Sequence, residues 1–85
     1  MIISFTPIAF DDYQSWEKED KALYKKINAL IKDILRSPFA GIGKPEPLKH
    51  ELSGYWSRRI TNEHRLVYKV TQNEVLFLSC KYHYE

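Results

Sequence analysis

The sequence has only one cysteine, Cys80, among its 85 residues. A lone cysteine can form no disulfide within the chain and supplies no thiolate cluster for zinc, which favours a reducing compartment such as the cytoplasm. No run of apolar residues approaches the roughly 20 that are needed to span a bilayer. The apolar start of the chain also lacks the basic segment that opens a secretory signal. We therefore expect a cytoplasmic protein that is neither exported nor inserted into a membrane.

The chain carries little net charge, at +2. Basic and acidic residues balance at six each in residues 1–42, and basic residues lead by seven to five in residues 43–85. Such a small excess permits a nucleic-acid partner without requiring one. With 44% hydrophobic and 28% charged residues, the composition is that of a globular protein. A chain of this length makes a single domain, residues 1–85, with one core, so that any activity lies on its surface.

The first half of the chain has the periodicity of helices. Residues 1–6 are β-branched and aromatic and predict a short strand, after which Pro7 can open a first helix. Asp20 is suited to cap a second, longer helix, which Pro38 ends. The apolar residues of this second helix recur every three or four positions and predict one buried face: Leu23, Ile27, Leu30, Ile31 and Ile34.

The second half has the pattern of strands. Residues 39–54 contain all three glycines and two of the four prolines, which predicts an irregular connection with a short strand at 48–52. Three strand-forming segments follow at 55–61, 64–70 and 75–82, joined by hairpin-length connections. The predicted fold class is α+β, with a small curved antiparallel sheet and two N-terminal helices packed on one face. The other face of the sheet would be free to bind a partner.

Several short motifs occur together and in order in this sequence: EPLKH at 46–50, WSRRI at 56–60, EHRLVY at 63–68 and YHY at 82–84. With them the chain resembles the YoeB/Txe group of bacterial toxins in the RelE superfamily, over essentially its whole length. The resemblance implies a RelE-like fold related to microbial RNases, and a ribosome-dependent endoribonuclease that cleaves mRNA in the decoding site. It implies no metal and no cofactor. It also implies a YefM/Axe-type antitoxin as partner, and it suggests a homodimer.

The resemblance further implies six residues that act on RNA, which are the catalytic Glu46, Arg65 and His83 and the RNA- or phosphate-binding Lys49, Arg59 and Tyr84. One departure from the group concerns the end of the chain, since such toxins commonly finish on the His-Tyr pair and this sequence adds Glu85. An extra carboxylate there can favour the protonated histidine or repel phosphate.

The three catalytic residues also make chemical sense. Metal-free cleavage of RNA requires a base for the 2′-hydroxyl, an acid for the departing 5′-oxygen and a cation for the charge on phosphorus. Glu46 is the candidate base, although a glutamate is weak in this role near neutral pH and needs desolvation. His83 is the candidate acid, because an imidazole can donate a proton at neutral pH. Arg65 offers a planar fork that fits phosphate oxygens.

The position of the two arginines depends on the turn between their strands. A symmetric two-residue turn at Asn62 and Glu63 would place Ile60 opposite Arg65 and send Arg59 to the other face of the sheet. If Arg59 shares the site with Arg65, the connection must contain a bulge or an odd number of residues. We therefore predict such a connection.

Several candidate residues also have purely structural interpretations. Arg58, Arg59 and Arg65 could pair across strands with Glu63 or Glu74, and we assign Arg58 to structure. We expect His50 and His64 to be backbone hydrogen-bond partners or surface residues, and no two histidines have the short spacing of a zinc site. Five aromatic residues are assigned to packing: Tyr13, Trp16, Tyr55, Trp56 and Tyr68.

A second function from another class is a non-catalytic interaction module of the same superfamily. Such a module would bind RNA, gyrase or only an antitoxin. Gyrase-directed relatives lack the set of base, acid and arginine, so the presence of Glu46, Arg65 and His83 favours cleavage.

Overall fold

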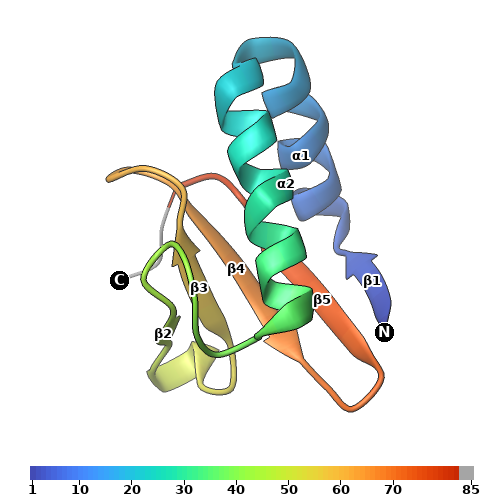
Figure 1. The fold of residues 1–85 in the computed structure, drawn as a ribbon, viewed down its shortest axis with the longest axis vertical. Coiled ribbons are helices and arrows are strands. Elements are labelled where there is room, and N and C mark those ends of the chain that lie inside the picture. The colour runs from blue at the N-terminus through green and yellow to red at the C-terminus, as the bar shows by residue number, and fades with distance from the viewer. Residues whose placement is uncertain (83–85) are drawn as a thin grey trace.

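Two helices make up most of the N-terminal half of the structure, a computed structural model that describes residues 1–82. Helix α1 (Pro7–Glu19) begins after Thr6, whose hydroxyl oxygen accepts a backbone N–H of the first turn. Helix α2 (Lys21–Arg36) begins after Asp20, whose carboxylate accepts two more. The two helices lie side by side (Figure 1). Both predicted helices and the Asp20 cap are confirmed, and neither of these helices is long and apolar enough to cross a membrane.

Five strands form one sheet in the order β1-β5-β4-β3-β2. They are β1 (Ile2–Phe5), β2 (Glu46–Pro47), β3 (Trp56–Arg59), β4 (Arg65–Val70) and β5 (Glu74–Ser79). The helices cover one face of this sheet (Figure 1), as the predicted α+β class requires. The meander from β2 to β5 is antiparallel, but β1 pairs with β5 in parallel, so that the sheet is mixed. This parallel pair is possible because a long connection, helices included, separates the two strands.

The predicted short strand at 48–52 is wrong. The strand of this region is β2, which precedes it, and a single 3₁₀ turn follows at His50–Leu52. His50 has a φ of 58°, a left-handed conformation that no strand accommodates. The turn sends the chain back, and β2 pairs with β3.

The core lies between α2 and the sheet. Four of the five residues of the predicted apolar stripe of α2 are buried, with Ile27, Leu30 and Ile34 fully inaccessible, and Leu23 packs against them partly buried. Tyr68 and Phe77 from β4 and β5 face this stripe and pack ring to ring at 6.2 Å. Trp16 and Tyr68 are buried, which confirms their assignment to packing. The only thiol, on Cys80, is also buried, and its burial raises its pKa to about 12, so that it stays protonated at neutral pH.

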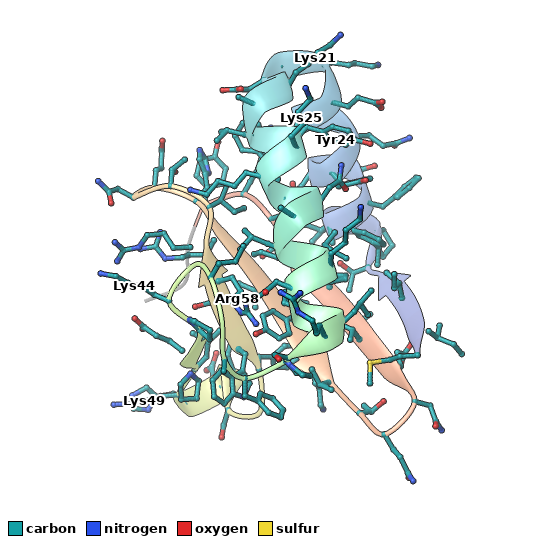
Figure 2. The ribbon with its side chains drawn as sticks, viewed as in Figure 1. Lys21, Tyr24, Lys25, Lys44, Lys49 and Arg58 are labelled. Atoms are coloured by element: carbon teal, nitrogen blue, oxygen red, sulfur yellow. The ribbon has the colours of Figure 1, made fainter. Side chains whose placement is uncertain are left out.

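Arg58 is buried at the lower end of α2 (Figure 2), with none of its side chain exposed. All five of its N–H donors have partners: the Asp33 carboxylate, the Tyr68 hydroxyl and the carbonyls of Ser37, Ala40 and Ile42. The structural assignment of Arg58 is confirmed. The Arg58 side chain points to the face of the sheet that the helices cover. Its ionic partner there is Asp33 of α2, at 2.7 Å between Nη1 and Oδ2. This network fixes residues 37–42, the connection that leads to β2.

Candidate active site

The hairpin of β3 and β4 brings two arginines together. Arg59 and Arg65 are directly opposite each other in the ladder, with the five residues 60–64 between them. An odd connection puts both side chains on one face of the sheet. The Thr61 hydroxyl holds this loop by accepting the backbone N–H groups of Glu63 and His64. The predicted odd loop is confirmed.

Glu46 lies on the same face of the sheet as the two arginines. In the register of β2 and β3, Glu46 is opposite Ser57, which precedes Arg59 by two residues and therefore faces the same way. This makes Glu46 a diagonal neighbour of Arg59, at about 7–8 Å between backbones. The face is the one without helices, because the intervening Arg58 points into the core. Glu46 itself is exposed to solvent.

The two guanidinium groups are held differently. Nη1 of Arg65 donates to the carbonyls of Thr61, Asn62 and His64 in its own hairpin, which orients the group. Nε of Arg59 is buried and has no hydrogen-bond partner among the described residues. Like charges directly opposite in a ladder repel each other, and a buried donor without a partner costs free energy. An anion with several oxygens, such as a phosphate, bound between the two guanidinium groups would offset the repulsion between their charges.

Lysines lie on the loops around β2. Lys49 is exposed and comes directly before the 3₁₀ turn. Figure 2 shows Lys44 and Lys49 extending from the β2 side of the molecule, away from the helices. Lys44 was not singled out from the sequence, although its place two residues before Glu46 was a signal. These lysines add positive charge on the side where Glu46 lies.

The last described residues return to the hairpin. The backbone N–H of Arg65 donates to the Tyr82 carbonyl at 2.8 Å, and the Tyr82 N–H donates to Nδ1 of His64, also at 2.8 Å. The expected role of His64 as a backbone hydrogen-bond partner is thereby confirmed. The remaining predicted site residues, His83 and Tyr84, lie outside the described residues, as does Glu85.

No metal site is apparent among residues 1–82, where no group of three or more His, Cys, Asp or Glu side chains is placed to hold an ion. The described residues place a carboxylate and two guanidinium groups on one face of the sheet. This arrangement can bind a phosphodiester and accept a proton beside it.

The sequence matches the model of one protein family, described as YoeB-like toxin of bacterial type II toxin-antitoxin system, over residues 5–84. Among individual proteins, it is 63% identical to Toxin YoeB of Escherichia coli strain K12 over 76 residues, which cover 89% of this chain and 90% of that protein.

Solved structures give the same result. The chain superposes on the YoeB/ParE toxin from Agrobacterium tumefaciens with a TM-score of 0.96 at 48% identity, covering 99% of this chain and 100% of that one. It is also similar to YoeB from Staphylococcus aureus, at 54% identity and with 99% and 98% of the two chains covered. Two structures of that protein match. One is described as a YoeB dimer and has a TM-score of 0.93, and the other is described as a heterotetrameric YoeB-YefM toxin-antitoxin complex and has a TM-score of 0.91.

Proposed function

Because this chain belongs to the YoeB-like toxins of bacterial type II toxin–antitoxin systems, we propose that it is a metal-independent endoribonuclease that cleaves mRNA on the ribosome and so inhibits translation. The family resemblance read from the sequence motifs is thereby confirmed. The observation that carries the proposal is the pairing of Arg59 with Arg65 on the helix-free face, with Glu46 on the same face.

The proposed reaction needs one base, one cation and one acid. Glu46 removes the proton of a 2′-hydroxyl, and the 2′-oxygen attacks the adjacent phosphorus. Arg65, aided by Arg59, stabilises the negative charge that develops on the phosphate oxygens. His83 donates a proton to the 5′-oxygen as its bond to phosphorus breaks. The upstream piece then ends in a 2′,3′-cyclic phosphate, and the downstream piece begins with a 5′-hydroxyl.

The exposure of Glu46 supports a dependence on the ribosome. Glu46 is exposed to solvent in the protein alone, whereas a carboxylate acts best as a general base where water is excluded. A bound mRNA strand, enclosed in the decoding site, would exclude water from Glu46 and complete the site. Lys49 would contact the backbone of the strand and Tyr84 would stack on a base.

The same proposal includes two protein partners. YoeB of Staphylococcus aureus is described both as a dimer and in a complex with YefM, and we infer that this chain likewise forms a homodimer and binds a YefM-type antitoxin. Acidic segments of an antitoxin would be attracted to the positive charges of Arg59 and Arg65.

The direct test is to incubate the purified chain with mRNA, both free and on ribosomes, and to map the 5′ ends. We expect cuts mainly on ribosomes, each leaving a 5′-hydroxyl on the downstream piece. The matched control is His83→Ala, which should keep the fold, reduce cleavage to a small residual rate and lose growth arrest. Equal growth arrest by the native chain and by His83→Ala would instead support the non-catalytic interaction module.

A further inference from the structure

We propose that His64 is a positioning residue for the proposed reaction: by binding the backbone N–H of Tyr82 it fixes the residue from which the chain continues to His83, the proposed acid. The inference rests on the proposed function, since it assigns His83 the role of the acid. It assigns a role in the reaction to a residue that does not contact RNA and that acts only through its hydrogen bond with Tyr82.

The contact that carries the inference is the hydrogen bond from the Tyr82 N–H to Nδ1 of His64, at 2.8 Å. Tyr82 has a φ of 59°, in the left-handed region that a residue other than glycine adopts at a cost. Such a conformation persists only where its surroundings hold it. Here the His64 imidazole binds the N–H of Tyr82, and the Arg65 N–H binds its carbonyl at 2.8 Å.

The imidazole is itself held in one orientation. Its ring lies edge to face with Trp16 at 4.9 Å between centroids, and only 13% of the His64 side chain is exposed. Because Nδ1 accepts a hydrogen bond, the ring proton must be on Nε2, which lies 3.4 Å from the Glu63 carboxylate. The neighbours of His64 therefore determine both its orientation and its tautomer.

Helix α1 holds the two residues that precede Tyr82. The Asp12 carboxylate accepts the Cys80 N–H at 3.0 Å, and Nε1 of Trp16 donates to the Cys80 carbonyl at 2.8 Å. The Lys81 ammonium pairs with Glu19 at 2.9 Å. These contacts end at residue 81, so among residues 1–82 the contacts of Tyr82 with His64 and with the Arg65 N–H are the nearest in sequence to residue 83.

Such an attachment matters for rate because consecutive Cα atoms are only about 3.8 Å apart. A change of φ at Tyr82 would change the direction in which the chain continues to residue 83. A displacement of about 1 Å at a reacting group can lower the rate on the order of 10²-fold. Loss of the His64 contact would therefore lower the rate of the chemical step and leave the affinity for ribosomes unchanged.

Two substitutions distinguish the effect of the hydrogen-bond acceptor of His64 from the effect of its ring. His64→Phe keeps a ring against Trp16 but removes the acceptor, whereas His64→Asn loses the ring and keeps an acceptor oxygen close to the position of Nδ1. We expect His64→Phe to slow single-turnover cleavage on ribosomes by about 10- to 100-fold, and His64→Asn to retain more of the rate. Ribosome affinity should be the same for both.

The decisive comparison is made in a His83→Ala background. If His64 acts through His83, adding His64→Phe to His83→Ala should cause no further loss of the residual rate. A second loss as large as the first would overturn the proposal, because a residue with an independent role adds its effect to that of His83→Ala.

Hydrogen exchange tests the attachment without reference to any ribonuclease activity. The Tyr82 amide should exchange faster in His64→Phe than in the native chain or in His64→Asn, and unchanged exchange would refute the contact. If His64→Phe fails to fold, ¹⁵N chemical shifts of the native chain replace it, since they should show Nδ1 of His64 without a proton. A native chain with this attachment but no cleavage would refute the proposed function alone, and a protonated Nδ1 would refute the positioning role alone.

Discussion

Replacement of Arg58 by methionine is expected to lower the free energy of unfolding by about 3–5 kcal/mol, the usual cost of removing one partner of a buried ion pair. Methionine keeps the apolar stem of the side chain but removes the buried donor of the Asp33 carboxylate, which keeps only Arg36 and the Ile42 N–H, and it leaves three backbone carbonyls without the guanidinium donor. Domains of this size have a total stability of only about 5–15 kcal/mol. The Arg58→Met variant should therefore be close to unfolding at 37 °C. Urea titrations of the native chain and of the variant would measure the difference in their free energies of unfolding.

Arg36→Met is the matched control for this substitution. Arg36 also binds Asp33, through Oδ1 at 2.9 Å, but 80% of its side chain is exposed. Exposed ion pairs contribute about 0–1 kcal/mol, so Arg36→Met should cost no more than that. Equal losses in the two variants would mean that the buried network adds nothing beyond an ordinary surface pair.

The same network predicts a loss of stability in acid. Hydrogen bonds from Arg58 and then Arg36 hold the pKa of Asp33 below its usual value of 3.8. A carboxyl group whose pKa is lower in the folded state contributes stability that is complete well above 3.8 and is lost as the pH falls through the folded value. We expect urea midpoints measured between about pH 5 and pH 2 to fall less steeply for Asp33→Asn than for the native chain. Parallel curves would exclude Asp33 as a source of the acid sensitivity.

Local patterns predicted the helices and the arrangement of the arginines. The stripe of α2 and the Asp20 cap are repeating or adjacent features of the sequence, and strand parity linked the faces of Arg59 and Arg65 to the number of residues between them. The face of the sheet on which Glu46 lies was harder to predict from such patterns. It depends on β2, a strand of two residues within a segment rich in glycine and proline.

Contacts between distant segments could not be predicted in the same way. Asp33 and Arg58 are 25 residues apart, and in the sequence Asp33 is indistinguishable from a surface carboxylate at the edge of an apolar stripe. The parallel pairing of β1 with β5 likewise joins the two ends of the chain. His64 was predicted to be a backbone hydrogen-bond partner or a surface residue, but only the folded chain identifies its partner as the N–H of Tyr82.

The second large effect is expected at Arg65. Replacement by methionine should slow mRNA cleavage on ribosomes by about 10²–10³-fold, the usual cost of removing a group that stabilises charge in the transition state. Arg65→Lys should fall between the native chain and Arg65→Met, because an ammonium keeps the charge but cannot bind two phosphate oxygens as a planar fork does. Single-turnover rates with ribosome-bound mRNA would measure both effects.

Arg59→Met distinguishes a site built for an anion from two arginines that merely stabilise the hairpin. It removes a like charge opposite Arg65, worth roughly 0.2–1 kcal/mol, together with a buried Nε that has no partner among the described residues. Cleavage by Arg59→Met should therefore fall while the free energy of unfolding stays level or rises, as expected where stability is given up for activity. A variant that loses stability and cuts at the native rate would show that Arg59 serves the fold. Arg65 would then be the only guanidinium left for the phosphate.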